Sequence, residues 1–237
     1  SIGMLRKGLR EMGVAQNTLV WFMSDNGGLP RLDPPTTGGL RSFKGSMYEG
    51  GLRVPAIIEW PKGISEVRVT KHPAGAVDIF PTIAEVAGLE KSDLLKPQDG
   101  MSLAKLFLKE PGPRQKPLPF RSRGRIAVVD NDYKMISFPD RGKTRYELYN
   151  LANDMSEQDN LVKKEPKIAN QLRKKLKAID ASVTASVNGQ DYPEKKVTPQ
   201  PPRIFWWERE SYRPYFSEWI KRPEYGQRLK RHIESQK

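Results

Sequence analysis

Cysteine is absent from this chain of 237 residues, and histidine occurs only twice. Without cysteine, the chain can build neither a disulfide framework nor a thiolate metal site. This absence leaves the compartment open, because oxidising compartments permit disulfides without requiring them. Imidazole chemistry could come only from His72 and His232, and neither lies in a pattern to which we assign a role.

Long hydrophobic runs are also absent. No apolar segment approaches the ~18 residues of a membrane span, and the opening SIGMLRKGLREMG lacks the apolar core of a signal peptide. Its apolar residues Ile2, Leu5, Leu9 and Met12 recur at intervals of three and four, which predicts an amphipathic helix that Gly13 ends. Because this helix has no start signal and position 1 is not Met, we expect further sequence upstream.

Acidic residues are outnumbered. The chain has 41 Lys and Arg against 28 Asp and Glu, for a net charge of +13. Such a surface suits an anionic partner, whether nucleic acid, an acidic membrane surface or a polyanionic substrate, and the charge does not choose among them. The length fits one large domain or two modest ones, with enough hydrophobic residues for a core.

Two apolar segments in the first quarter of the chain predict strands. Residues 18–23 (TLVWFM) indicate a strand buried on both faces, as in a parallel sheet. Residues 53–60 (RVPAIIEW) indicate a second strand, in which Pro55 favours a sheet edge or confines the ladder to Ala56 onward. Between them, residues 24–52 form a loop rich in Gly, Pro and Ser.

Helices follow this loop and its strands. Asp78 is predicted to cap a helix over residues 78–88, and a shorter helix is predicted over 102–109. The order helix, strand, loop, strand, helix indicates an α/β architecture for residues 1–115. Residues 110–119 (EPGPRQKPLP) predict a proline-rich linker.

A different pattern begins after the linker. Residues 125–129 and 133–138 predict a β-hairpin, and residues 146–151 a further strand. Residues 166–183 predict a helix with one apolar face and many lysines on the other. We therefore expect residues 116–187 to form a small antiparallel sheet packed by one helix.

The tail, residues 188–237, is first proline-rich and then interleaves aromatic and basic residues (RIFWWERESYRPYFSEWIKRPEYGQRLKRH). Such a mixture can bind single-stranded nucleic acid by stacking, but no nucleic-acid-binding motif accompanies it. We favour an extension that packs its aromatic residues back on the body or makes an oligomer contact, without nucleic acid as a partner.

The loop between the predicted strands holds the residues best suited to chemistry. Asp25 and Asn26 follow the last apolar residue of the first strand, Met23, and ligands of α/β sheets collect at the carboxyl ends of strands. Their oxygens suit a hard cation such as Ca²⁺ or Mg²⁺, although two ligands are too few for either ion.

Lys44 lies in the glycine-flanked SFKGS stretch of the same loop. An ammonium beside a divalent cation requires an anion between them, so the three residues together indicate a tetrahedral oxyanion, either sulfate or phosphate. The alternative is a plain surface turn with a solvated lysine, since Asp-Asn-Gly is a strong turn signal. Residue types alone favour that turn.

The amino-acid sequences of several stretches resemble those of one protein family. NTLVWFMSDNGG, GGLRSFKGSMYEGGLRVPAIIEWPKGI, VDIFPTIAEVAGL and QDGMSL occur in order, followed by YKMIS and ELYNLANDMSEQDNL. Together they resemble the sulfatases, the arylsulfatase-like sulfuric ester hydrolases of the alkaline phosphatase superfamily. The resemblance covers residues 1 to about 190 and implies the C-terminal part of a mixed-sheet α/β domain plus a small α+β subdomain.

The resemblance also implies roles for individual residues. Asp25 and Asn26 match two ligands of the catalytic cation, usually Ca²⁺, with Mg²⁺ as the alternative. Lys44 matches the lysine that contacts the sulfate and the ester oxygen, which makes it both a substrate-binding and a catalytic residue. Glu49, Arg53 and the two glycines that follow Glu49 match loop architecture, in which a Glu–Arg pair braces the turn.

The family nucleophile is not found in these residues. Sulfatases use a formylglycine made from Cys or Ser in a C/S-x-P-S-R motif upstream of the Asp-Asn pair. We expect it, with further cation ligands, in an N-terminal part that precedes Ser1, and we expect no turnover from this chain alone. Residues 137–141 (SFPDR) mimic the motif, but we interpret them as a strand end and a turn.

The resemblance implies hydrolysis of a sulfate ester, and the positive charge fits a sulfated polysaccharide as substrate. It also implies a periplasmic, secreted or lysosomal location. Two alternatives stay open. One is a phosphatase or phosphodiesterase-type relative in the same superfamily, which typically uses two metals. The other is a non-catalytic protein that binds polyanions.

Overall fold

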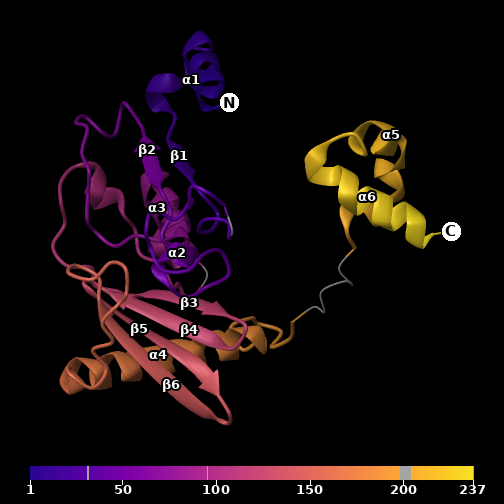
Figure 1. Cartoon of the computed structure of the whole chain (residues 1–237). Coiled ribbons are helices and arrows are strands. Elements are labelled where there is room, and N and C mark those ends of the chain that lie inside the picture. The colour runs from indigo at the N-terminus through magenta and orange to yellow at the C-terminus, as the bar shows by residue number, and fades with distance from the viewer. Residues whose placement is uncertain (31, 95, 198–203, 237) are drawn as a thin grey trace. The chain divides into compact units, whose positions relative to one another are not determined.

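The computed structural model describes residues 1–30, 32–94, 96–197 and 204–236 (Figure 1). The chain divides into two compact units, Ser1–Lys195 (unit 1) and Lys196–Lys237 (unit 2). The predicted division at 115/116 and 187/188 stays a prediction, and part of the proline-rich tail, 198–203, lies outside the described residues. Among the described residues, no helix combines the length and apolarity needed to cross a membrane.

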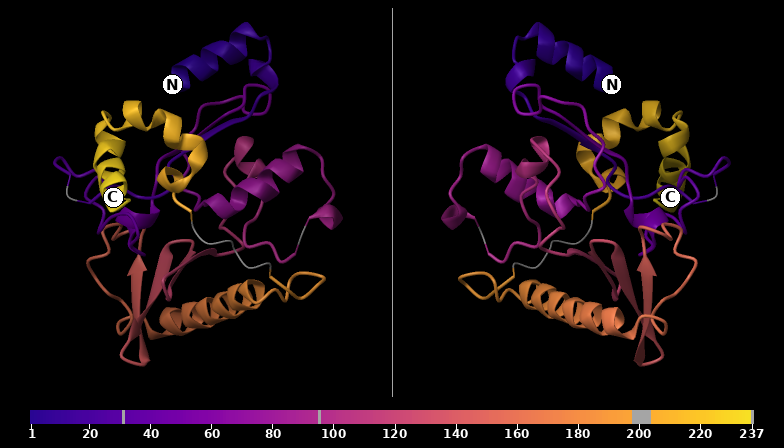
Figure 2. Two further views of the ribbon diagram at one scale, coloured as in Figure 1. Left: turned by 90° about the vertical axis from the view of Figure 1, so that its right-hand side faces the viewer. Right: turned by 90° about the vertical axis from the view of Figure 1, so that its left-hand side faces the viewer.

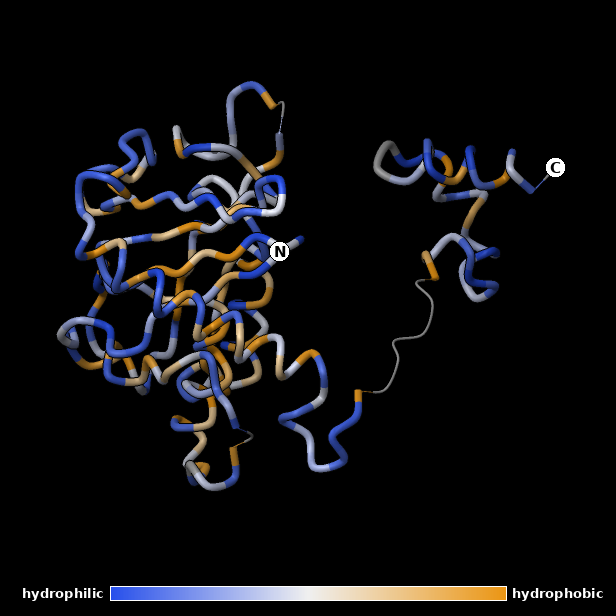
Figure 3. Tube along the Cα trace, turned by 90° about the horizontal axis from the view of Figure 1, so that it is seen from below, coloured by the Kyte–Doolittle hydropathy of each residue, from blue (hydrophilic) through white to orange (hydrophobic). Residues whose placement is uncertain are grey.

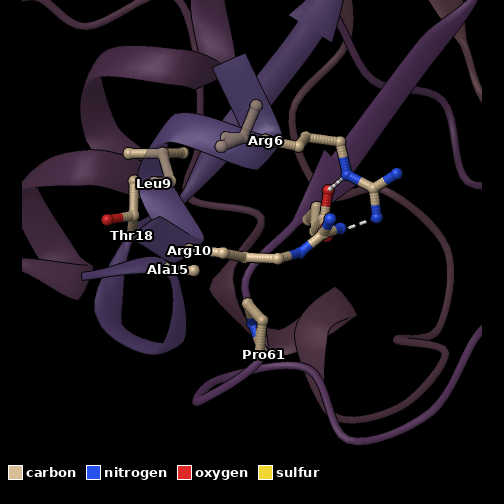
Figure 4. Close-up of a pocket in the computed structure, with 8 residues that line it drawn as sticks. Arg6, Leu9, Arg10, Ala15, Thr18 and Pro61 are labelled. Atoms are coloured by element: carbon tan, nitrogen blue, oxygen red, sulfur yellow. Dashed lines mark hydrogen bonds and ion pairs between the residues drawn. The ribbon is translucent and has the colours of Figure 1, made fainter. Parts of the chain in front are cut away.

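Unit 1 begins with helix α1 (Ile2–Glu11), and Gly13 follows it with a φ of +71°, which confirms the predicted helix end. A salt bridge of 2.6 Å between the Arg6 guanidinium and Glu59 joins α1 to the second strand (Figure 4). This ion pair is solvent-exposed, and it borders a small pocket that Leu9, Arg10 and other residues line.

Strands β1 (Val20–Met23) and β2 (Ala56–Glu59) form a two-stranded antiparallel sheet, with Val20 opposite Glu59. The predicted ladder from Ala56 onward is confirmed. The prediction that residues 18–23 are buried on both faces as in a parallel sheet is wrong, because β1 pairs antiparallel. The side chains of Phe22 and Ile57 are 42% and 65% exposed.

Helix α2 (Glu49–Leu52) lies between β1 and β2 along the chain. Helix α3 (Ile79–Val86) and a 3₁₀ helix, Ala104–Phe107, which is shorter than the predicted 102–109, follow β2. Asp78 occupies the N-cap position of α3, but its carboxylate does not cap the helix. The carboxylate instead accepts hydrogen bonds from Arg114, at 2.7 and 2.9 Å, because a buried guanidinium requires an anionic partner.

The prediction of a linker over residues 110–119 is therefore wrong in part. The side chains of Arg114 and Asp78 are both fully buried, so this segment is anchored to the body. It also leads into strand β3 (Leu118–Ser122), which has Pro119 as its second residue. A proline is tolerated there because β3 is one of the two edge strands of its sheet.

The second sheet of unit 1 has four antiparallel strands in the order β3–β4–β5–β6. Its other strands are β4 (Arg125–Asp130), β5 (Tyr133–Asp140) and β6 (Lys143–Asn150). Helix α4 (Pro166–Val187) lies across one face (Figures 1 and 2). The predicted antiparallel sheet packed by one helix is confirmed, and residues 137–141 form a strand end and turn as expected.

Both faces of this sheet are buried. Ile126, Val128 and Leu148 pack with Leu172 and Leu176 of α4. The neighbouring residues in the alternation face the other way and form a second cluster, which includes residues from the loop that precedes α2. That cluster contains Met47, Leu118, Ala127, Val129, Ile136, Tyr149 and Leu151. The sheet therefore supports the loop that carries the predicted site.

Unit 2 contains the short helix α5 (Phe216–Trp219) and the longer α6 (Pro223–Ser235). Its trace is mainly blue to white by hydropathy, with only short orange segments (Figure 3). Its aromatic rings pack on one another around Trp206, and Leu229 of α6 is fully buried. The predicted packing of the tail on the body stays a prediction.

Candidate functional site

The three predicted site residues line a single open pocket. Asp25 and Asn26 come from the end of β1, and Lys44 comes from the loop before α2. The rest of the lining is provided mostly by the glycine- and threonine-rich loop and by the segment that enters β2: Ser24, Gly27, Gly28, Leu29, Thr36, Thr37, Gly38, Leu40, Arg53, Val54 and Pro55. The structure thus places a carboxylate, a carboxamide and an amine around one space.

Backbone contacts hold the two halves of this pocket together. The Lys44 N–H donates to the Gly28 carbonyl at 2.8 Å, and the Gly27 N–H donates to the Gly51 carbonyl at 3.1 Å. A Cβ on Gly27 would lie 2.0 Å from the carbonyl oxygen of Gly50, inside contact distance. The glycines of the DNGG and EGG stretches are therefore required for close approach of the two loops.

The side chains of the site are available for a ligand. Asp25 and Lys44 are exposed and Asn26 is half-buried. Across residues 1–30, 32–94, 96–197 and 204–236, none of these three side chains makes a hydrogen bond or an ion pair. A carboxylate and a carboxamide with open oxygens fit a hard cation, and a free ammonium fits an anion beside it.

Among the described side chains, the donor set for a metal is incomplete. Ca²⁺ takes roughly six to eight oxygen ligands, and Asp25 and Asn26 supply two side chains. No group of three or more His, Asp or Glu side chains in the described parts of the chain could hold a metal ion. Further ligands would have to come from the substrate, from water or from other polypeptide.

Behind the pocket, the predicted Glu–Arg brace is confirmed. Glu49 is 4% exposed and pairs with Arg53 at 2.6 Å. Glu49 also pairs with Lys134 at 2.8 Å, and Lys134 pairs with Glu157 at 2.9 Å. The Glu157 carboxylate accepts the Glu49 backbone N–H at 2.6 Å. Strand β5 and the loop after β6 thereby fix the start of α2.

The two carboxylates of this group differ in pKa. Burial opposes ionisation of Glu49, but the ion pairs with Lys134 and Arg53 outweigh it and lower the pKa of Glu49. Burial raises the pKa of Glu157, since Lys134 and the Glu49 backbone N–H offset the burial only in part. One buried cation thus stabilises chiefly the carboxylate of Glu49.

A second group of polar contacts fixes the other end of the Lys44 loop. Arg41 donates to the Tyr149 hydroxyl at 3.0 Å and to the Glu157 carbonyl at 2.7 Å. Its guanidinium also lies 3.9 Å from the centre of the Tyr48 ring. Tyr48 donates to Glu147, and burial together with this hydrogen bond raises the pKa of Tyr48 to about 12. The tyrosine therefore stays protonated as a donor.

Sequence reasoning missed Lys134, Glu157 and Arg41 as supports of the site. Lys134 lies in an alternating strand (YKMIS), where a lysine is typical of a solvent-facing position, yet its side chain is fully buried. Glu157 lies 108 positions from the Glu49 N–H that it accepts. No local pattern signals such a pairing, so only the fold could reveal it.

A model of the sulfatase family matches residues 1–89 of this chain. A sulfatase of Formosa agariphila is 34% identical over 169 residues, which covers 65% of this chain and 30% of that protein. Human arylsulfatase A is 35% identical over 144 residues, which covers 56% of this chain and 27% of the relative. The chain thus spans less than a third of the length of either relative.

A solved structure agrees with these matches. The crystal structure of Ps i-CgsB in complex with k-i-k-neocarrahexaose superposes with a TM-score of 0.63 at 29% identity, over 75% of this chain and 39% of that one. The matched family region contains the whole pocket, from Ser24 to Pro55. The α/β fold, the similar sequences and the matched region agree that residues 1–89 of this chain, which contain the pocket, belong to the sulfatase family.

Proposed function

We propose that this protein forms the cation-binding and sulfate-binding side of a sulfatase active site. The proposal rests on one observation above all: Asp25, Asn26 and Lys44, the residues that match the family motifs, line one pocket and have no other partners in the described parts of the chain. The reaction is hydrolysis of a sulfate ester by cleavage of the sulfur–oxygen bond.

Each residue has a distinct task in this proposal. The Asp25 carboxylate and the Asn26 carboxamide oxygen hold a Ca²⁺ ion, or Mg²⁺ in its place, and that ion supplies Lewis-acid stabilisation of charge on the sulfate oxygens. Lys44 neutralises the sulfate and donates to the ester oxygen as charge develops there. The buried ion pairs of Glu49 keep the Lys44 loop in place.

The nucleophile is proposed to come from another part of the protein, as a formylglycine in an N-terminal part. Large apolar side chains on α1 and on the β1–β2 sheet support such a partner. Met4, Leu5 and Ile57 are 79%, 53% and 65% exposed. Exposed apolar area of this kind is typical of surfaces that other polypeptide covers. We expect this chain alone to show no turnover of an aryl sulfate.

The proposed substrate class is a sulfated polysaccharide, in an extracytoplasmic location. The net charge of +13 supports a polyanionic substrate. The crystal structure of the solved relative named above is a complex with k-i-k-neocarrahexaose, which supports this class by similarity.

The test is a calorimetric Ca²⁺ titration of the full chain. Two protein side chains predict weak binding, with a dissociation constant of about 10⁻⁴ to 10⁻³ M. Asp25→Asn removes the charged ligand and should abolish binding. Asp93→Asn, which makes the same change at an exposed position outside the pocket, is the matched control and should leave binding unchanged. Equal Ca²⁺ affinity for wild type and Asp25→Asn would refute the site.

The anion is tested separately. With Ca²⁺ present, inorganic sulfate should bind and inorganic phosphate should bind more weakly, if the site suits a sulfate ester. A clear preference for phosphate would favour the phosphatase-type alternative instead. The Lys44→Met variant, which keeps the side-chain length but removes the charge, should lose affinity for both anions.

A further inference from the structure

Unit 2 is not explained by the proposed active site. Residues 196–237 contain ten Lys and Arg, five Glu and no Asp. Around the buried Leu229, the helix α6 exposes Arg228, Lys230 and Arg231. None of these three makes an ion pair within the described residues, whereas Arg213 and Arg222 pair with glutamates on their own helical turns. The helix therefore presents unneutralised positive charge.

Aromatic rings accompany this charge. Phe205 and Trp207 are stacked, with centroids 4.5 Å apart and planes at 5°, and the Arg228 guanidinium lies 5.7 Å from the centre of the Trp207 ring. Tyr215 and Trp219 form a second stack at 5.4 Å and 18°. The Tyr215 side chain remains 51% exposed, so the second stack ends in a ring that is accessible to solvent.

These rings are held in place by a core of their own. The Trp206 ring contacts five other rings of unit 2, with centroids between 5.3 and 6.4 Å away: Trp207, Tyr212, Phe216, Trp219 and Tyr225. Aromatic side chains lose little conformational entropy when they bind, and rings fixed in this way lose less. Unit 2 therefore combines rigid exposed aromatic faces with free cations.

We infer that unit 2 is a binding module for a sulfated polysaccharide chain. The apolar C–H faces of pyranose rings pack on exposed aromatic faces, and sulfate groups pair with the arginines and lysines of α6. This inference rests on the proposed function, since a polysaccharide is favoured over nucleic acid because the same chain carries a sulfatase pocket. A module tethered to that pocket raises the local concentration of a polymeric substrate.

The experiment measures binding of fluorescent dextran sulfate to the full chain by anisotropy. The variant Arg228→Glu/Lys230→Glu/Arg231→Glu should weaken binding by about tenfold or more, because three contacts become repulsive. The matched control is Lys163→Glu/Lys174→Glu/Lys177→Glu, which makes the same charge change at exposed lysines of unit 1 that form no ion pair in the described part of the chain. Equal weakening by both variants would mean non-specific attraction and would overturn the inference.

A second pair of variants tests the aromatic face. Tyr215→Ala should weaken binding of dextran sulfate, and Tyr192→Ala, a 49% exposed tyrosine in unit 1, should not. Near-UV circular dichroism reports whether the ring core of unit 2 persists in each variant. If Tyr215→Ala keeps that core and binds as tightly as wild type, the proposed stacking is wrong.

Other classes of ligand are outcomes of the same assay. Tighter binding of an oligo(dT) strand, or of vesicles with anionic lipid, than of dextran sulfate would overturn the assignment to polysaccharide. The Arg228→Glu/Lys230→Glu/Arg231→Glu variant should leave the Ca²⁺ titration unchanged, since its substitutions lie in unit 2 and Asp25 lies in unit 1. The experiments can therefore distinguish a failure of the proposed Ca²⁺ site at Asp25 from a failure of the proposed polysaccharide binding by unit 2.

Discussion

The charged residues that line the candidate pocket and those that support the Lys44 loop from the protein interior have opposite environments. Asp25 and Lys44 are exposed and without partners among the described residues, whereas Glu49 and Lys134 are buried and paired. Buried charges are tolerated only when they are paired, so the second set can fix a loop but cannot bind a ligand. The first set has the reverse property: it contributes little to folding and is free to bind.

This difference predicts that stability and binding separate by residue. Substitutions behind the loop should lower the free energy of unfolding, and substitutions in the pocket should change ligand affinity alone. The three stability predictions below are ordered from the largest expected effect to the smallest, and each uses urea unfolding followed by circular dichroism.

Lys134→Met should be the most destabilising change, by about 4–5 kcal/mol at pH 7, because it leaves two buried carboxylates without their shared cation. In the folded variant the pKa of Glu49 should rise from its lowered position, and the pKa of Glu157, which is already above the ordinary value, should rise further. Protons bind more tightly to the folded variant than to its unfolded chain, so its stability should recover as pH falls from 7 toward about 5.

In the wild-type protein, the contribution of Glu49 to the free energy of unfolding should change with pH in the opposite direction. Its folded pKa is lowered, so the stability that its ionised carboxylate contributes is present above 4.5 and is lost as pH falls through the folded pKa. The difference in unfolding free energy between wild type and Lys134→Met should therefore narrow at acid pH. A difference that is constant between pH 7 and pH 5 would contradict the ion-pair account.

Asp78→Asn should destabilise by about 3–4 kcal/mol, since it leaves the fully buried Arg114 guanidinium without an anion. Its control is Asp159→Asn, which removes an exposed ion pair with Lys164 and should cost less than about 1 kcal/mol. Similar losses in the two variants would show that burial of the Arg114 pair is unimportant.

Gly50→Ala should cost about 1–3 kcal/mol, because the new Cβ would lie 2.2 Å from the Ser42 carbonyl oxygen and would force the loop to move. Gly112→Ala is the control, since a Cβ there meets no atom within 4 Å. The Gly50 variant should also weaken Ca²⁺ binding, because Gly50 packs against Gly27, which directly follows Asn26. Unchanged stability and affinity would show that close approach of the loops is not needed.

The sequence could predict the residues that act locally. The strand end at Met23, the turn that follows it and the glycine-flanked Lys44 are all short-range patterns, and the predicted hairpin after residue 125 follows the same logic. The resemblance to sulfatase motifs then identified Asp25, Asn26 and Lys44 as site residues, and the structure places them around one pocket. Their roles as ligands stay a proposal.

The sequence could not predict what supports those residues. Lys134 and Arg114 are charged side chains in segments that are typical of a surface strand and a linker, and their burial depends on partners 85 and 36 positions away. Strand β3 was missed because Pro119 argues against a central strand, although an edge strand accepts it. Contacts between residues far apart in the sequence determine each of these features, and hydrophobic periodicity does not reveal such contacts.

The most direct test of this account is the linkage between sulfate and Ca²⁺ in the pocket. If Asp25 and Lys44 face one bound anion, sulfate should raise the affinity for Ca²⁺, and Ca²⁺ should raise the affinity for sulfate by the same factor. The account predicts that Lys44→Met abolishes this coupling but keeps Ca²⁺ binding and the wild-type unfolding free energy. Undiminished coupling in Lys44→Met, or coupling lost only together with stability, would contradict it.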